Sequence, residues 1–148
     1  MQKFRLLLLD ANIVIELHKL GLWEKVVREY SATLTSTVVD EAKYWEEEEK
    51  RQHPFDLAQD IEKGKIACKE ISLSQIAKFR QKFDPSYLER LDDGETESLV
   101  FLCESDEEWL ISSSDAIVFK VLGRLGRGKQ GISLEEILQQ IGLGCQLD

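Results

Sequence analysis

Four acidic residues of this chain lie where a hard metal ion could bind, at the ends of predicted strands or the starts of predicted helices. They are far apart in the sequence: Asp10, Glu41, Glu95 and Asp115. Each also lies in line with apolar residues of its helix or at the inner end of its strand, where an unpaired charge would be costly. Mg²⁺ and Mn²⁺ prefer oxygen ligands, and either ion would relieve the repulsion among these carboxylates. Residue type and position therefore predict a magnesium or manganese site.

The segment before Asp10 is the clearest strand of the sequence. Residues 6–9 are four consecutive leucines, a pattern typical of a central strand that is buried on both faces of a parallel sheet. Open α/β sheets bind ligands beyond the carboxyl ends of their strands, which is where Asp10 lies. A helix follows, so Asp10 could also be a simple N-cap. The strand-end position favours the functional interpretation.

Each of the other three acids also has a structural explanation. Glu41 is three residues from Val38 and four from Trp45, so these side chains are expected on one helical face. Glu95 and Asp115 align in the same way with apolar residues of the helices that they open. Acids in a first helical turn favour the helix macrodipole, and aspartate is a good N-cap. The case for a metal site therefore depends on the four acids taken together, in their order along the chain, and not on any one of them.

Strands and helices are expected to alternate along the chain. Strands are predicted over residues 4–10, 32–36, 66–73 and 109–113. Helices are predicted over residues 12–19, 22–30, 38–50, 55–63, 95–103 and 115–125, with another that is capped by Ser74 and a last one opened by the capping box Ser133 to Glu136. With no linker or repeat in between, the sequence predicts one α/β domain over residues 1–148, with a central parallel sheet flanked by helices on both faces.

The composition is that of a soluble globular protein. Of 148 residues, 43% are hydrophobic and 32% charged, and no apolar run approaches the roughly 18–20 residues that span a bilayer. We therefore expect a cytoplasmic protein without a membrane partner. The net charge of −9 argues against a generic polyanion binder, although divalent cations could still bridge local carboxylates to phosphate. Three cysteines without a C-x-x-C pair predict neither a disulfide framework nor a zinc site.

Four segments that contain the four acids resemble the motifs of the PIN-domain nucleases, a family that includes the VapC-type toxins of toxin–antitoxin pairs. The segments follow one another in the order of the family's motifs: residues 6–15, 34–41, 92–99 and 109–116. The third segment resembles the Gly-Glu form that one branch of the family uses. The resemblance spans nearly the whole chain, and its first and third segments together are the most specific part.

The resemblance implies a set of catalytic metal ligands: Asp10, Glu41, Glu95 and Asp115. The same acidic turn offers two substitutes for the third acid: Glu97 and Asp93. Polar supports beside the site would be Asn12, Ser113 and Ser114. Family members are usually ribonucleases that prefer single-stranded RNA, so the implied reaction is hydrolysis of RNA phosphodiester bonds with Mg²⁺ or Mn²⁺ as cofactor. If the chain is a toxin, an antitoxin protein is its implied partner.

An acidic nuclease needs a local surface that attracts RNA. The glycine-bearing loop of residues 123–131 carries the best candidates for binding phosphate: Arg124, Arg127 and Lys129. A second basic cluster lies earlier in the chain: Lys78, Arg80 and Lys82. Metal-dependent hydrolysis needs no protein nucleophile, so His18 is expected on a helix surface and His53 in a loop. Tyr44 and Trp45 could stack on a base, but packing in the core is the simpler expectation for Trp45.

Other classes of function remain open on the sequence alone. A PIN-like module without catalytic activity, acting through RNA or protein contacts, would need the same fold, and a failure to bind Mn²⁺ would favour it. A receiver-type domain also places an aspartate at a strand end, but it would need more acids near its start and a strand-end lysine, and neither is evident. The apolar helix near Leu17, Leu20 and Trp23 could bury a homodimer interface or pack in the core.

Overall fold

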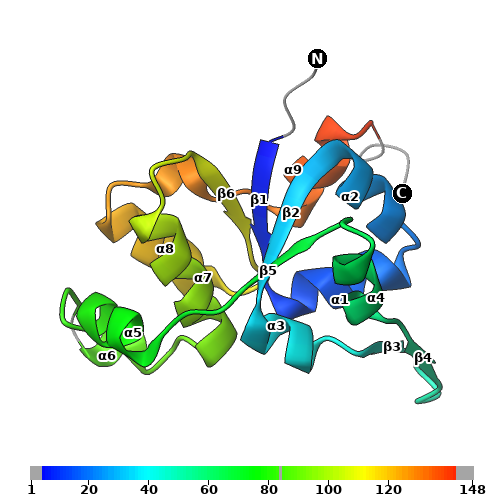
Figure 1. The fold of residues 1–148 in the computed structure, drawn as a ribbon, viewed down its shortest axis with the longest axis horizontal. Coiled ribbons are helices and arrows are strands. Elements are labelled where there is room, and N and C mark those ends of the chain that lie inside the picture. Colours follow the sequence, from blue (N-terminus) through cyan, green and yellow to red (C-terminus); the bar gives the residue numbers. More distant parts are fainter. Residues whose placement is uncertain (1–4, 84, 143–148) are drawn as a thin grey trace.

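A four-stranded parallel sheet forms the centre of the molecule (Figure 1). The computed structural model describes residues 5–83 and 85–142. The strands lie in the order β5-β2-β1-β6: β5 (Ala67–Lys69), β2 (Tyr30–Thr35), β1 (Arg5–Leu9) and β6 (Trp109–Ser112). β1 is central because its leucines pair on both sides, with Leu7 opposite Ala32 of β2 and Leu8 opposite Ile111 of β6. The expected parallel α/β fold is confirmed.

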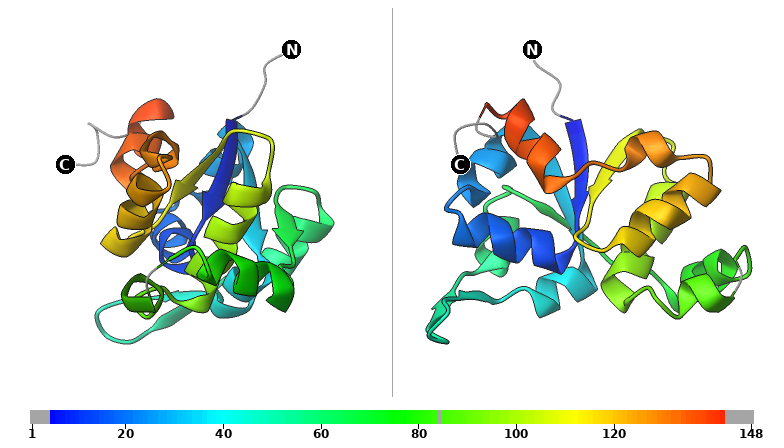
Figure 2. Two further views of the ribbon diagram at one scale, coloured as in Figure 1. Left: turned by 90° about the vertical axis from the view of Figure 1, so that its left-hand side faces the viewer. Right: turned by 180° about the vertical axis from the view of Figure 1, so that it is seen from behind.

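The leucine run of β1 contributes to two separate hydrophobic cores. Leu7 and Leu9 pack with apolar residues from one group of helices, whereas Leu8 packs with apolar residues from a second group. Successive strand residues point to opposite faces, so a strand covered on both sides must be apolar throughout. Figure 2 shows helices on both sides of β1. The expectation that helices flank both faces of the sheet is thus confirmed.

The helices follow the expected order closely. On the side of Leu7 and Leu9 they are α1 (Ala11–Lys19), α2 (Trp23–Glu29), α4 (Leu57–Glu62) and α9 (Leu134–Gln140). On the side of Leu8 they are α5 (Leu73–Arg80), α7 (Asp93–Glu104) and α8 (Ala116–Arg124). Shorter segments complete the set: α3 (Ser36–Glu41), α6 (Pro85–Leu88) and the 3₁₀ turn η1 (Gly128–Gln130).

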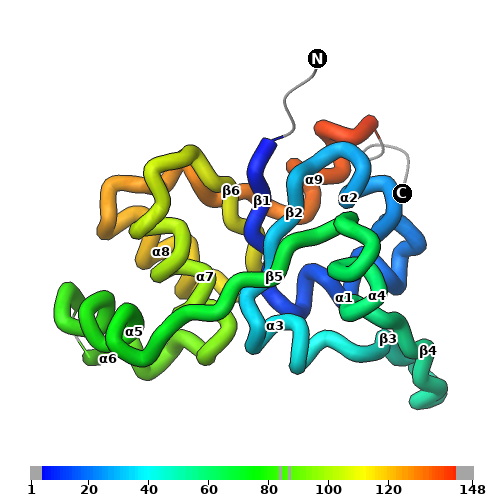
Figure 3. The backbone as a smooth tube through the Cα atoms, viewed as in Figure 1, coloured from blue at the N-terminus to red at the C-terminus, as the bar shows by residue number. Residues whose placement is uncertain are grey.

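The helix expected over residues 38–50 is wrong beyond Glu41, where α3 ends. The chain instead forms a hairpin of β3 (Tyr44–Glu46) and β4 (Gln52–Pro54), which extends away from the sheet (Figure 3). Trp45 stacks on His53 with ring centroids 3.9 Å apart, so neither the core position of Trp45 nor the loop position of His53 is as expected. A longer helix would also have crowded the glutamates of residues 46–49 into one turn, where like charges repel.

Two helix starts show how closely caps can be predicted. Ser133 and Glu136 form the expected capping box at the start of α9. The cap of α5 is Ser72, not Ser74, because Ser72 and Gln75 exchange side-chain and backbone hydrogen bonds. The earlier start also shortens the strand expected over residues 66–73, since the chain must already turn before the helix.

Several smaller expectations can be compared with the structure. Leu17 and Trp23 are buried in the core, so the apolar helix is explained by packing within one chain, while Leu20 remains exposed. Cys68 and Cys103 are free, half-buried thiols, and Cys145 lies outside the described residues. Across residues 5–83 and 85–142, none of the helices is long and apolar enough to cross a membrane.

Candidate functional site

The carboxyl ends of β1, β2 and β6 meet at one edge of the sheet, called here the carboxylate edge. Asp10 follows β1, α3 with Glu41 follows β2, and Ser113 with Asp115 follows β6. The first turn of α7 brings Glu95 to the same edge, where α7 contacts α3 (Figure 1). Parallel strands all end on the same side, so the topology gathers acids that are distant in sequence.

Asp10 is held at the carboxylate edge by both of its oxygens and is only 6% exposed. Its Oδ1 accepts a hydrogen bond from the backbone N–H of Ile13 at 2.9 Å and so caps α1. Its Oδ2 accepts from the hydroxyl of Ser113 at 2.6 Å and from the backbone N–H of Ser114 at 3.3 Å. Burial raises the pKa of Asp10 above its usual value, although these hydrogen bonds oppose the shift.

Ser113 joins two of the buried acids of this edge, Asp10 and Glu95. Its Oγ lies 2.6 Å from Oδ2 of Asp10 and 3.3 Å from Oε2 of Glu95, and it accepts a hydrogen bond from the backbone N–H of Asp115 at 3.0 Å. A hydroxyl has a single proton to donate. The shorter distance assigns that proton to Asp10, so Glu95 is best satisfied when it carries a proton of its own and donates to Ser113.

Glu95 has the most strongly perturbed carboxyl group at this edge. It is 4% exposed, and its Oε1 accepts from the backbone N–H of Asp92 at 3.0 Å, in a capping box that starts α7. Burial is the main cause that raises the pKa of Glu95 to about 7; the charges of Asp92, Asp115 and Asp10 act in the same direction, against the backbone hydrogen bond. A carboxyl group with this pKa changes its charge near neutral pH.

Glu41 and Asp115 are exposed, which corrects the expectation that all four acids face the interior. Asp115 caps α8, with Oδ1 accepting from the N–H of Ile117 at 3.1 Å. Glu41 is the last residue of α3 and does not share a face with Trp45, because the helix ends before that residue. Partial burial and the charges of surrounding acids, which include Asp92 and Asp10, raise the pKa of Glu41.

Glu97 lies on a different side of α7 from Glu95. Its Oε2 accepts a hydrogen bond from the hydroxyl of Thr37 on α3 at 2.6 Å, and its buried Oε1 has no hydrogen-bond partner among the described residues. Its charge acts on Glu41. Glu97 therefore belongs with Glu41 and α3, whereas Glu95 belongs with Asp10. The other substitute, Asp93, is exposed.

Sequence reasoning missed three residues that shape this edge. Asp92 is the N-cap of α7, and its position three residues before Glu95 is a capping-box pattern that could have been recognised. Thr37 could not have been recognised, because its contact with Glu97 depends on how α3 packs on α7. Gly94 permits that packing, since a Cβ there would lie 3.1 Å from a methyl group of Val38.

The three residues expected to support the site, Asn12, Ser113 and Ser114, differ in whether they contact the buried acids. Ser113 contacts Asp10 through its hydroxyl, and Ser114 does so through its backbone N–H. Asn12 lies in the first turn of α1 and is exposed. The structure thus places one of the three supporting side chains, that of Ser113, in direct contact with the buried acids.

The basic loop lies at the opposite edge of the sheet. Arg127 donates to Gln130 at 3.1 Å, and Gln130 donates to the carbonyl of Trp109, the first residue of β6, at 2.8 Å. α8 leads away from the carboxylate edge, and η1, which contains Lys129, contacts both α8 and β6 (Figure 3). The three basic candidates and the four acids do not form one surface.

No cation neutralises the buried acids in the part of the chain that the structure describes. The salt bridges there join His53 to Glu47 and Lys65 to Glu24, away from Asp10. Within the same residues, no three side chains of His, Cys, Asp or Glu are grouped so that they could surround one metal ion. The carboxylate edge thus has two buried acids that share a hydroxyl, with two exposed acids beside them. Neither a protein-family model nor a curated protein matches the chain.

Proposed function

We propose that this protein is a divalent-metal-dependent endoribonuclease of single-stranded RNA, with a PIN-like domain. The observation that carries the proposal is the pair Asp10 and Glu95, two buried carboxyl groups that share the Ser113 hydroxyl without a neighbouring cation among the described residues. Burying two such groups together is costly unless they are protonated or bound to a cation. A bound cation would offset this cost.

The residues of the carboxylate edge fit Mg²⁺ or Mn²⁺ by their chemistry. All of the donors are oxygen atoms, which these hard cations prefer to nitrogen or sulfur. Asp10 and Glu95 would hold the ion from inside, while the exposed Glu41 and Asp115 would have to turn toward them. When bound, such an ion activates water and stabilises the charge that develops on a scissile phosphate.

The protein itself would contribute positioning and electrostatics. Hydrogen bonds to the first turns of α1 and α7 fix the carboxylates of Asp10 and Glu95, so little side-chain entropy remains to be lost on binding. The amino ends of α1, α7 and α8 all point to this edge. Their partial positive charges favour carboxylates and also a phosphate group of RNA.

A catalytically inactive module with the same fold is the second candidate. It is favoured by the fact that Asp10, Glu95 and Asp115 each make a helix-capping hydrogen bond, because capping alone would be a structural reason for these acids. Such a module would act through contacts with RNA or protein. A toxin with an antitoxin partner is a narrower form of the nuclease proposal and rests on the PIN resemblance alone.

Metal binding and RNA cleavage together test the proposal. We expect calorimetry to detect stoichiometric binding of Mn²⁺, and an unstructured, end-labelled RNA to be cut only with Mn²⁺ or Mg²⁺. The products should carry a 5′-phosphate and a 3′-hydroxyl, and EDTA should stop the reaction. Absence of stoichiometric Mn²⁺ binding would contradict the nuclease proposal and favour the inactive module.

A further inference from the structure

A pocket of about 300 Å³ lies at the far end of α1 from Asp10, between α1, the start of α2 and the start of α4. Its lining combines aromatic rings with carboxylates: His18, Trp23, Phe55, Glu24, Asp56 and Asp60. Small-molecule sites are typically concave, with aromatic walls and a few convergent polar groups. The carboxylate edge has no part in this pocket.

The aromatic walls are held in a stack around His18. The ring of His18 lies 3.6 Å from the ring of Phe55, at an interplanar angle of 6°, and 4.6 Å from the ring of Trp23, at 25°. Trp23 is buried in the core, whereas His18 and Phe55 are half-buried and border the pocket. His18 thus lies between the two other rings: Trp23 anchors the stack in the core, and Phe55 is the outer ring beside the pocket.

His18 is a neutral hydrogen-bond acceptor within this pocket. Its Nδ1 lies 2.8 Å from the carbonyl of Val14, and a carbonyl only accepts, so Nδ1 carries the proton. The remaining nitrogen, Nε2, then has a free lone pair. Burial lowers the pKa of His18, against the influence of that carbonyl and of Asp60 and Glu24, so the ring adds no positive charge near pH 7.

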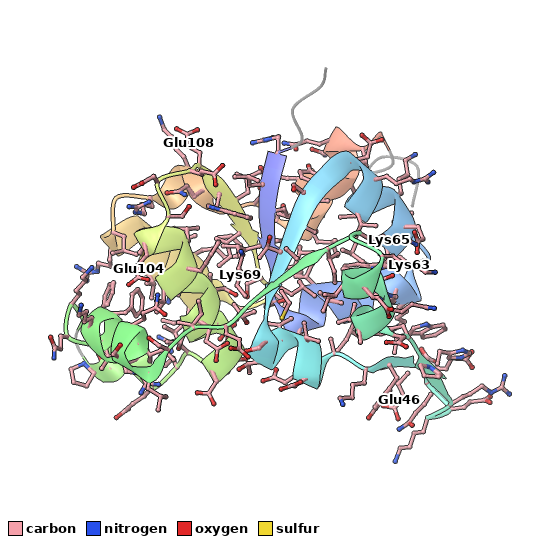
Figure 4. All side chains as sticks on the ribbon, in the orientation of Figure 1. Glu46, Lys63, Lys65, Lys69, Glu104 and Glu108 are labelled. Atoms are coloured by element: carbon pink, nitrogen blue, oxygen red, sulfur yellow. The ribbon has the colours of Figure 1, made fainter. Side chains whose placement is uncertain are left out.

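The carboxylates of the pocket leave an excess of negative charge. Oδ2 of Asp60 accepts from Nε1 of Trp23 at 2.9 Å, and Oδ1 of Asp56 accepts from the backbone N–H of Gln59 at 3.1 Å. These donors are neutral. Glu24 alone has a cationic partner among the described residues, Lys65 at 3.0 Å, and Figure 4 labels Lys65 on this side of the molecule. Asp56 and Asp60 remain uncompensated.

We propose that this pocket binds a planar organic cation of the guanidinium type. A guanidinium group stacks flat on aromatic rings and donates hydrogen bonds in its plane to carboxylates. Phe55, the outer ring of the stack, offers the stacking surface, while Asp56 and Asp60 offer the acceptors. The cation is an arginine side chain of a partner protein or a free alkylguanidinium compound. The proposal does not depend on the nuclease proposal.

Binding of two probes to the full chain tests this site. Agmatine supplies a free alkylguanidinium group, and N-butylurea is its uncharged planar analogue. We expect the Trp23 indole N–H signal in ¹H–¹⁵N spectra to shift saturably with agmatine, with a Kd of about a millimolar, as befits so small a ligand. N-butylurea should give no saturable shift. Equal binding of both probes would overturn the proposal, because charge would then have no role.

Two variants and a control locate the bound probe. Asp56→Asn removes the charge but keeps a good N-cap, and we expect it to weaken agmatine binding about tenfold, as for a lost charged hydrogen bond. Phe55→Leu should weaken binding several-fold, with circular dichroism verifying the fold. Glu29→Gln, an exposed acid of α2 outside the pocket, should change nothing. Unchanged binding in Asp56→Asn would show adventitious attraction to an acidic protein and overturn the site.

A third comparison identifies the source of the cation. Capped pentapeptides with a central arginine present the same group on a protein-like backbone. Tighter binding of any such peptide than of agmatine would identify a partner's arginine as the ligand, whereas weaker binding of all of them would identify a free compound. A failure of every probe would overturn the pocket proposal and would leave metal-dependent RNA cleavage unaffected.

Discussion

Acids lie near both ends of α1, but they differ in their burial and in their hydrogen-bond partners. At its start, Asp10 is buried and shares a hydroxyl with Glu95, and no cation among the described residues lies beside them. At its end, Asp60 accepts from an indole N–H and Glu24 pairs with a lysine at the surface. The number of acids is similar in both places. Their burial and their partners differ, and we propose a metal ion at the first group and an organic cation at the second.

Burial acts on both regions in the same physical way. Removing a charged group from water favours its neutral form, so burial raises the pKa of Glu95 to about 7 and lowers the pKa of His18. The result is a carboxyl group that carries a proton near neutral pH and an imidazole that does not. We propose that the carboxyl group exchanges its proton for a metal ion, whereas the neutral imidazole adds no positive charge beside Asp56 and Asp60.

The largest expected effect is that of Asp10→Asn at the carboxylate edge. We expect this variant to lose Mn²⁺-dependent RNA cleavage by roughly a hundredfold or more, because it removes the charge of the proposed inner metal ligand. The fold should persist, since asparagine can still cap α1. Initial rates on an end-labelled RNA, with circular dichroism of each variant, measure the effect.

Further variants serve as comparisons for Asp10→Asn in the same cleavage assay. Asp106→Asn removes an acid from the exposed turn before β6, far from the carboxylate edge, and should leave the rate unchanged. Glu97→Gln should reduce the rate less than Glu95→Gln, because Glu97 is held by Thr37 on the other side of α7. Wild-type activity in purified Asp10→Asn would reveal a contaminating nuclease. A larger loss in Glu97→Gln would make Glu97 the third acid.

The second effect is a pH-dependent gain of stability in Glu95→Gln. The pKa of Glu95 is raised from 4.5 to about 7 in the folded chain, so between those values the folded state binds more protons than the unfolded state. The free energy of unfolding of the wild type should therefore fall as pH rises from about 4.5 to 7. Glutamine does not ionise, so the variant does not lose stability as the pH rises, and its side chain can still form the capping box. We therefore expect Glu95→Gln to be more stable than the wild type at pH 8 by about 2 kcal/mol.

Urea unfolding in EDTA at pH 5 and pH 8 measures this gain. Glu108→Gln is the matched control, since Figure 4 shows Glu108 at the side of the molecule where β6 begins, and it is exposed. Glu108→Gln should change the free energy of unfolding by a similarly small amount at pH 5 and at pH 8. If Glu95→Gln behaved like Glu108→Gln, the carboxyl group of Glu95 would not be a buried group that resists ionisation.

A smaller effect is expected from Ser113→Ala. The substitution removes the hydroxyl that donates to Asp10 and lies beside Glu95, leaving buried carboxyl oxygens without that partner. We expect it to lower the free energy of unfolding by about 1–2 kcal/mol. Ser114→Ala is the neighbouring control, because Ser114 is exposed and contacts Asp10 only through its backbone. Similar stability of the two variants in thermal unfolding would contradict the shared role of Ser113.

The smallest effect is expected in the basic loop. Arg127→Ala combined with Lys129→Ala should change RNA affinity by less than about twofold, because the loop lies at the amino end of β6 and not at the carboxylate edge. Fluorescence anisotropy at two salt concentrations measures this affinity. A large loss, together with a smaller salt dependence, would show that RNA extends over that edge as well.

The order of the main strands and helices could be predicted because local signals agree with the tertiary structure. The leucine run of residues 6–9 is typical of a strand covered on both faces, and the capping box at Ser133 is a local signal for a helix start; both agree with the fold. The hairpin after α3 could not be predicted. In the hairpin Trp45 lies opposite His53 and stacks on it, a contact between residues that a helix would have separated.

The sequence by itself determined the types of acid and their positions at strand ends and helix starts, because hydrophobic periodicity and capping are local properties. Only the tertiary structure decided that Asp10 and Glu95 are buried around Ser113, that Glu41 and Asp115 are exposed, and that the basic loop lies at the other edge. Burial and hydrogen bonding set the charge of a carboxyl group, and both depend on which helices pack together across the sheet. The pocket around His18 arises in the same way, from α1, α2 and α4 packing together.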